Sequence, residues 1–80
     1  MGDALEAQDS PLNLTSREED VLRYLANGYH RAEIAEILEI KLPTVHQRIY
    51  TAQTKAGART TIQLIALFVL EKAREWTEAQ

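Results

Sequence analysis

Residues 31–57, RAEIAEILEIKLPTVHQRIYTAQTKAG, contain two helical patterns that are separated by only three residues. The first pattern covers about residues 31–38, residues 39–41 form the connection, and the second helix is expected to run from about residue 43 to about residue 56. Apolar residues recur every three or four positions in both patterns, which is typical of amphipathic helices. Two short helices joined by so tight a turn must cross steeply, and this is the geometry of a helix-turn-helix.

A further helix is predicted before this pair. Thr15 and Glu18 have the spacing of a capping box, in which each side chain accepts a hydrogen bond from a free backbone amide. An apolar stripe follows, and Gly28 is suited to the left-handed conformation that ends a helix. Residues 1–13 show no helical period, so the sequence predicts a flexible N-terminal tail there and one folded domain over residues 14–77.

A fourth helix is predicted to begin at a second capping box, Thr60 and Gln63, and to continue to about Trp76. It is apolar on two sides, and a small domain can cover only one of them, so the other side predicts a homodimer interface. The narrower stripe, assigned to the dimer interface, contains Leu64, Leu67 and Phe68. The wider stripe, assigned to the core, contains Ile62, Ile65, Ala66, Val69, Ala73 and Trp76. The predicted fold class is therefore all-α, a four-helix bundle-like domain with a helix-turn-helix and a dimerisation helix.

Charge is distributed unevenly along the chain. Residues 1–40 contain nine acidic residues against three basic ones, whereas residues 41–60 contain four basic residues and no acidic one. The net charge of −3 and the pI of about 5.3 are unusual for a nucleic-acid-binding protein. A polyanion, however, responds to the local field within a Debye length of roughly 8–10 Å. The helix over residues 43–56 is therefore the place to look for function.

The outward face of that helix carries uncharged hydrogen-bonding groups, and basic side chains lie along one edge. This arrangement suits a helix in a DNA groove, with base edges beneath it and phosphates alongside. Every amphipathic surface helix has a polar outer face, so this feature alone does not establish DNA binding. The predicted base contacts are His46, Gln47 and Tyr50. The predicted phosphate contacts are Arg31, Lys41, Thr44, Arg48 and Lys55.

Other chemistry has little support. There is no cysteine, and His30 and His46 have no partner at metal-ligand spacing, so we expect neither a metal site nor a cofactor. Hydroxyl groups such as those of Ser10 and Ser16 have no base at a spacing that suggests a nucleophile, so we expect no enzyme.

The sequence also contains no predicted membrane or export signal. The longest apolar run, residues 64–70, is far shorter than the ~20 residues of a bilayer span. Residues 1–7 contain acidic residues and no basic one, unlike a signal peptide. We therefore expect a cytoplasmic protein that does not bind membranes.

The order and spacing of many positions resemble a known family. These positions are Leu14-Thr15-Ser16-Arg17-Glu18, Val21-Leu22, Leu25-Ala26-Asn27-Gly28, Glu33-Ile34-Ala35, Leu38, Ile40, Thr44-Val45, Lys55 and Gly57. Together they resemble the DNA-binding domain of LuxR/GerE-type bacterial transcriptional regulators. The resemblance implies an all-α domain that binds double-stranded DNA as a homodimer, with the helix over residues 43–56 in the major groove. It also implies no enzyme chemistry and no cofactor, and we expect the domain to stand alone without a sensor domain.

The chain departs from the family pattern at several positions. Lys41 replaces the usual serine N-cap of the third helix, which costs about 1 kcal/mol. His30-Arg31-Ala32 replaces a usual Ser-Asn-Lys, which removes a phosphate-binding lysine that Arg31 can replace. The remaining replacements are His46 for a lysine, Arg48 for a histidine and Thr61 for an arginine. These changes do not alter the predicted fold, but the operator sequence cannot be inferred from the family. The loss of phosphate contacts also weakens non-specific affinity for DNA.

Two alternatives stay open. A sigma-factor promoter-binding domain resembles this chain at Glu33-Ile34-Ala35 and at Thr44-Val45-x-x-Arg48, but that family usually ends after its third helix. A protein-interaction module, such as an anti-activator that forms a heterodimer through the fourth helix, is favoured by the negative net charge. Its partner would be a related regulator, and a DNA-binding regulator can also have a protein partner in the transcription machinery. Whether the purified protein alone shifts DNA distinguishes the regulator from the anti-activator.

Overall fold

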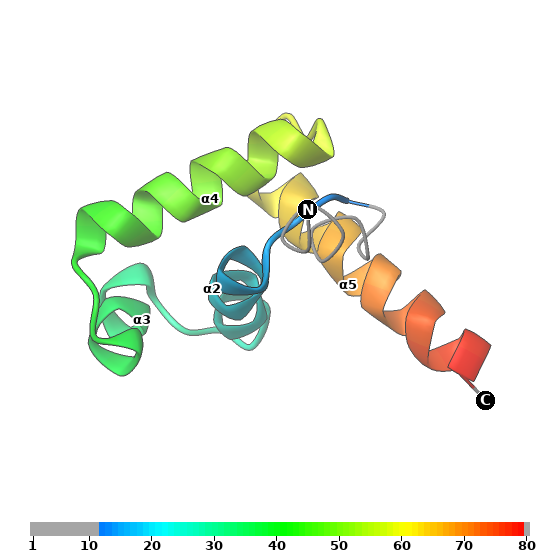
Figure 1. The fold of residues 1–80 in the computed structure, drawn as a ribbon, viewed down its shortest axis with the longest axis horizontal. Coiled ribbons are helices and arrows are strands. Elements are labelled where there is room, and N and C mark those ends of the chain that lie inside the picture. The colour runs from blue at the N-terminus through cyan, green and yellow to red at the C-terminus, as the bar shows by residue number, and fades with distance from the viewer. Residues whose placement is uncertain (1–11, 80) are drawn as a thin grey trace, which may run out of the picture.

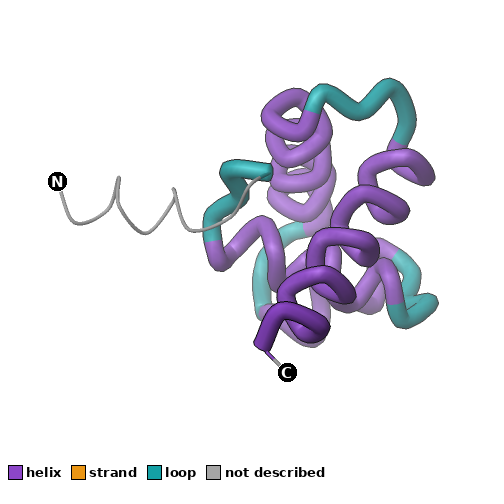
Figure 2. The backbone as a smooth tube through the Cα atoms, turned by 90° about the vertical axis from the view of Figure 1, so that its right-hand side faces the viewer, coloured by secondary structure: helices purple, strands orange, loops and turns teal. Residues whose placement is uncertain are grey.

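The computed structural model describes residues 12–79, and in that range it consists of four helices joined by short loops (Figures 1 and 2). The helices are α2 (Ser16–Ala26), α3 (Arg31–Leu38), α4 (Leu42–Ala56) and α5 (Thr61–Ala79). The described residues contain no strand, so the all-α prediction is confirmed for them. Most of the predicted tail lies outside the described residues, but Leu12 packs against the core.

The predicted start of the first helix is confirmed. The backbone amide of Thr15 donates a hydrogen bond to Glu18 Oε1 (2.9 Å), and the amide of Glu18 donates to Thr15 Oγ1 (3.2 Å). Both halves of the capping box are therefore present. α2 ends at Ala26, and Gly28 has a φ of +93°, in the left-handed region predicted for it.

The second capping box forms only in part. Thr60 Oγ1 accepts a hydrogen bond from the amide of Gln63 (3.0 Å), as predicted. Gln63 Oε1, however, accepts from the amide of Arg59 (2.6 Å), one residue before the expected donor. α5 then begins at Thr61 and continues to Ala79, beyond its predicted end.

The core lies where the inner faces of the four helices meet, and α4 packs against α2, α3 and α5. Each of the first three helices contributes the single apolar stripe predicted for it. The buried apolar residues are Leu14, Val21, Leu22, Ile34, Ala35, Val45, Ile49, Ala52, Leu64 and Phe68. Because the inner half of α4 is committed to this core, only its outer half is available to a ligand.

α3 and α4 cross steeply at the predicted turn, as Figure 1 shows. The amide of Ile40 donates to the carbonyl of Ala35 (3.0 Å), which ties the turn to the end of α3. Glu39 has a φ of 57° and a ψ of 45°, a left-handed conformation that is unusual for a residue with a side chain. Lys41 occupies the N-cap of α4 and makes no capping hydrogen bond, so nothing replaces the serine cap.

Most residues of the two apolar stripes of α5 face the opposite way from the prediction, although Ile65 of the wider stripe is half-buried and packs against the core as predicted. Leu64 and Phe68, which we assigned to a dimer interface, are buried in the core (0% and 3% exposed), and Leu67 is half-buried. Ile62 and Trp76, which we assigned to the core, are 83% and 67% exposed. The assignment was therefore wrong for Leu64, Phe68, Ile62 and Trp76.

Charged side chains explain why the narrower stripe is the buried one. Lys72 Nζ lies 5.6 Å from the centre of the Phe68 ring and forms an ion pair with Glu19 of α2 (3.2 Å). Glu71 is buried at the end of the stripe, and its carboxylate pairs with Arg74 (3.6 Å). Lys72 thereby extends the contact of α5 with α2, because a lysine stem covers apolar surface while its ammonium reaches a carboxylate.

Candidate nucleic-acid interface

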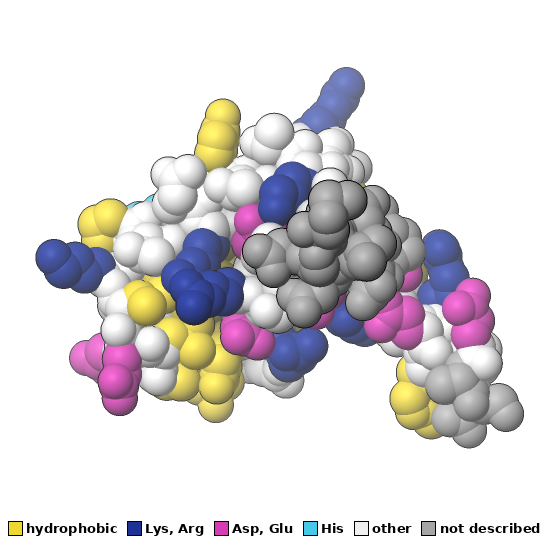
Figure 3. All heavy atoms as spheres, viewed as in Figure 1, with side chains coloured by type: hydrophobic (Ala, Val, Ile, Leu, Met, Phe, Trp, Pro, Cys, Tyr) yellow, Lys and Arg dark blue, Asp and Glu magenta, His cyan; other side chains and the backbone are white. Residues whose placement is uncertain are grey.

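The three predicted base-contacting side chains share the exposed side of α4. His46 and Gln47 are exposed, and Tyr50 is 66% exposed. Gln47 Nε2 donates only a long hydrogen bond to Thr51 Oγ1 (3.4 Å), so its amide is available to a ligand. In Figure 3 acidic side chains lie over α3, over α2 in the middle of the view and over α5, and none rises along the upper edge formed by α4.

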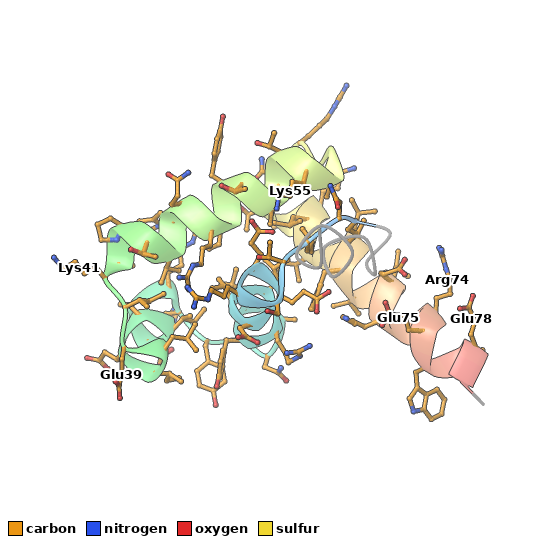
Figure 4. All side chains as sticks on the ribbon, in the orientation of Figure 1. Glu39, Lys41, Lys55, Arg74, Glu75 and Glu78 are labelled. Carbon is orange, nitrogen blue, oxygen red and sulfur yellow. The ribbon has the colours of Figure 1, made fainter. Side chains whose placement is uncertain are left out.

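The N-terminal end of α4 also suits an anion. Its first turn contains no acidic residue, and a helix N-terminus carries a partial positive charge. Lys41 is exposed there and points away from the domain (Figure 4), and Thr44 is half-buried one turn later. The helix dipole and the lysine together would favour an anion at this position.

The nine basic residues fall into two groups. Four of them form an ion pair with a carboxylate, and these are Arg23, Lys55, Lys72 and Arg74. The other five form no ion pair with any residue in the range 12–79, and these are Arg17, Arg31, Lys41, Arg48 and Arg59. Three of the unpaired five lie in the segment between Glu39 and Glu71 that has no acidic residue.

Lys55, a predicted phosphate contact, is instead turned toward α2 (Figure 4). Its Nζ donates to both carboxylate oxygens of Glu18, at 3.0 and 3.1 Å, and the Glu18 side chain is only 8% exposed. Glu18 Oε1 also accepts the amide of Thr15 in the capping box. Lys55 therefore joins the end of α4 to the start of α2, and we withdraw it from the phosphate contacts.

Arg31, another predicted phosphate contact, links three helices. From the start of α3 its Nη1 lies 2.9 Å from His46 Nδ1 on α4, and its Nη2 donates to Thr61 Oγ1 on α5 (3.3 Å). The Thr61 hydroxyl in turn donates to Gln53 Oε1 on α4 (3.4 Å). Arg31 is half-buried, and no carboxylate of the described residues 12–79 pairs with its guanidinium or neutralises its charge.

Two unpaired cations were missed by sequence reasoning. Arg59 lies in the loop between α4 and α5, at the C-terminal end of the candidate interface, and Arg17 lies in the first turn of α2. Arg59 belongs to the acid-free segment, which was a signal that could have identified it. Arg17 has acidic neighbours in sequence, and only the structure shows that none of them pairs with it.

A second exposed surface lies on α5 and is apolar. Its members recur at alternating intervals of four and three residues, which is the spacing of a helix–helix seam. They are Ile62, Ala66, Val69, Ala73 and Trp76, all of them exposed, with Leu70 (62% exposed) beside them. We call these residues the outer stripe of α5.

The sequence predicts neither a metal site nor a membrane-spanning helix, and the structure bears on both. In residues 12–79 no three His, Cys, Asp or Glu side chains are grouped so that they could hold a metal ion. None of the described helices is both long enough and apolar enough to cross a membrane.

Comparison with known proteins identifies the family. Residues 12–68, more than half of the chain, match the family model described as bacterial regulatory proteins, luxR family. The matching domain is a helix-turn-helix DNA-binding domain and is not catalytic, so both the predicted family and the prediction that the chain is not an enzyme are confirmed. Neither the curated proteins nor the solved structures gave a match to the chain.

Proposed function

We propose that this chain, which belongs to the luxR family of bacterial regulatory proteins, binds a specific double-stranded DNA sequence as a homodimer and regulates transcription. α4 lies in the major groove of each half-site, and its base contacts come from His46, Gln47 and Tyr50. The phosphate contacts come from Lys41, Thr44, Arg48 and Arg59, with the charge of Arg31 adding to the local field.

One observation carries this proposal. The exposed side of α4 has uncharged hydrogen-bonding groups and no acidic residue, and it is bordered by Lys41, Arg48 and Arg59, which form no ion pair with any residue in the range 12–79. The negative charge belongs to other parts of the chain, because every acidic residue lies either at or before Glu39 or at or after Glu71. A phosphate backbone close to α4 therefore experiences a positive field although the whole protein is acidic.

The outer stripe of α5 supports the homodimer. A monomer rarely exposes a contiguous apolar surface of this kind, and two copies of one helix can bury it by packing around a two-fold axis. The small side chains of Ala66 and Ala73 alternate with the larger Ile62, Val69 and Trp76, so two such helices can interdigitate. A two-fold dimer places two copies of α4 at positions that match inverted half-sites.

The direct test is selection of duplex fragments from a genomic library by the purified protein, followed by sequencing. We expect an enriched site with two inverted half-sites about one helical turn apart, roughly 10 bp. Affinity should fall steeply between about 50 and 200 mM salt, because bound counterions are released from the phosphates. Failure to retain any duplex at micromolar protein and about 50 mM salt would contradict the proposal.

The anti-activator is the second candidate, and one observation favours it. The ion pair between Lys55 and Glu18 removes one of the four basic residues of the segment 41–60 from the DNA-facing set. If the chain is an anti-activator, the outer stripe of α5 packs against the corresponding helix of a larger luxR-family regulator rather than against a second copy of this chain. A protein that binds no DNA alone, but forms a complex with a luxR-family regulator and releases it from its operator, would establish this alternative.

A further inference from the structure

The contact between Arg31 and His46 indicates which nitrogen of the neutral histidine ring carries the proton. Arg31 Nη1 and His46 Nδ1 are 2.9 Å apart, which is hydrogen-bond distance. A guanidinium group has only donors, so Arg31 must donate and Nδ1 must accept. An imidazole whose Nδ1 accepts carries its proton on Nε2, so the contact requires the neutral ring in the Nε2–H form.

The surroundings of Arg31 hold it in this position. Its other terminal nitrogen donates to Thr61 Oγ1 of α5, and Thr61 is itself bonded to Gln53 of α4. The guanidinium thus bridges α4 and α5 from the first residue of α3. No carboxylate among the described residues competes for it.

We propose that Arg31 is a positioning residue that holds His46 in the Nε2–H form, so that α4 presents a hydrogen-bond donor and selects a base with an acceptor edge. This inference rests on the proposed function, since it assigns a specificity to one position of the same α4 surface. The ring of His46 is exposed, and Nε2 lies on the side of the ring away from the arginine-bound Nδ1. Guanine, with O6 and N7 in the major groove, is the best partner for a donor, and cytosine, which offers only its N4 amino donor, is the worst.

The first measurement is made on the free protein. Nitrogen-15 NMR of the imidazole at mildly alkaline pH distinguishes the two neutral tautomers, and His46→Gln identifies the signals of this ring. We expect His46 to be in the Nε2–H form in the wild type and to become a mixture of tautomers in Arg31→Ala. A wild-type ring that carries its proton on Nδ1, or a tautomer ratio that Arg31→Ala leaves unaltered, would overturn the inference.

The second measurement is site selection with randomised duplexes. We expect the wild type to favour guanine over cytosine at one position of each half-site by about fivefold, the lower end of the usual effect of a specific base contact. Arg31→Ala should reduce this preference to less than about twofold while the preference at other positions is kept. Arg31→Lys should keep part of it, because an ammonium is also a donor without an acceptor.

Arg48→Ala is the matched control, since it removes one positive charge from the same domain without touching His46. It should weaken binding to every sequence and leave the preference of the His46 position unchanged. If Arg31→Ala behaves like Arg48→Ala, then Arg31 contributes only charge and the inference is wrong. If the wild type retains no duplex at all, the proposed function has failed and the base-selecting role of His46 fails with it, whereas the NMR result on the free protein shows separately whether the Arg31 contact exists.

Discussion

The outer faces of α4 and α5 differ in the kind of partner that each can accept. α4 exposes His46, Gln47 and Tyr50 in a segment without acidic residues, whereas α5 exposes the apolar outer stripe. A polar surface bordered by unpaired cations favours a hydrated polyanion. An apolar seam gains free energy only when another apolar surface excludes water from it.

The inner faces of α4 and α5, unlike their outer faces, are chemically alike. Both bury aliphatic or aromatic side chains against α2, so burial in the core distinguishes neither helix. In so small a domain, the functional differences between the helices therefore come from the exposed residues that do not pack in the core. Comparing a substitution at a buried position with one at an exposed position of the same helix is the sharpest test of this difference between core and functional residues.

The largest effect is expected for Phe68→Ala on the inner side of α5. Phe68 is 3% exposed and contacts the Lys72 ammonium, so its truncation leaves a cavity and should destabilise the domain by about 3–5 kcal/mol. Val69→Ala, on the next residue and 47% exposed, should change the stability of the dilute protein by less than about 0.5 kcal/mol. Urea unfolding measures the free energy of unfolding of both variants. The protein concentration must be low and the same for each, because dimer dissociation adds a concentration-dependent contribution to the apparent stability.

Val69→Glu tests the outer side of α5. A carboxylate in the middle of the outer stripe should give a folded, helical monomer, because burying it in an interface without a partner is costly. The loss of linked half-sites should weaken binding to the full operator by roughly a hundredfold, and binding to a single half-site much less. Light scattering and circular dichroism measure assembly and folding. A wild type that stays monomeric at about 100 µM, well above the affinities of ordinary dimers, would contradict the homodimer.

The two sides of α5 also show which part of the fold could not be predicted from the sequence. For α2, α3 and α4 each helix has one apolar stripe, and the stripe predicted to be buried is the one that the structure buries. α5 has two, and the criteria used were the width of each stripe and the interruption of the narrower one by Glu71 and Glu75, which favoured the wrong choice. In the structure the buried stripe is flanked by the ion pair of Lys72 with Glu19 of α2, a contact between residues far apart in the chain that helical spacing cannot predict.

The same limit applies to the predicted interface. Helical spacing placed His46, Gln47 and Tyr50 on the exposed side of α4, and the structure confirms their exposure, although it does not test their contact with DNA. Spacing also placed Lys55 at the edge of that side, but its partner Glu18 belongs to another helix. Local periodicity predicts which way a side chain points from its own helix and cannot predict which charge it meets.

Lys55→Met and Lys41→Met compare the two ends of α4. Without Lys55, the buried Glu18 carboxylate loses its cation, and the domain should lose about 2–3 kcal/mol of stability. Lys41→Met should change stability by less than about 0.5 kcal/mol but weaken DNA binding and make its salt slope shallower by about 0.9. Replacing Glu18 by glutamine and Lys55 by methionine together should restore part of the stability, because no unpaired charge then remains and the glutamine oxygen can still accept the Thr15 amide. Equal stability of the two single variants would show that the Glu18 ion pair contributes nothing.

Gln47→Ala and Arg48→Ala separate specificity from affinity on α4 itself. Gln47→Ala should relax the preference at one base pair and cost about 1–3 kcal/mol on the best site, with little change on random DNA. Arg48→Ala should weaken binding to both kinds of DNA alike, because a phosphate contact carries no sequence information. Fluorescence anisotropy with the selected operator and a scrambled duplex measures both. An unaltered preferred sequence for Gln47→Ala would mean that this face of α4 does not contact the bases.

The smallest effect is expected at Glu39, in the turn that sets the direction of α4 from α3. The left-handed conformation of Glu39 costs a residue with a side chain roughly 1–2 kcal/mol, and glycine avoids this cost. Glycine also makes the unfolded chain more flexible, which offsets about 0.4–1 kcal/mol, so Glu39→Gly should stabilise the domain by about 0.5 kcal/mol. Glu39→Gln removes the same negative charge and keeps the side chain, so the difference between the two variants isolates the backbone effect. Glu36→Gly, in the regular part of α3, should instead destabilise the domain by about 1 kcal/mol. If Glu39→Gly is no more stable than Glu39→Gln, the turn is not strained, and the direction of α4 is set by its core contacts alone.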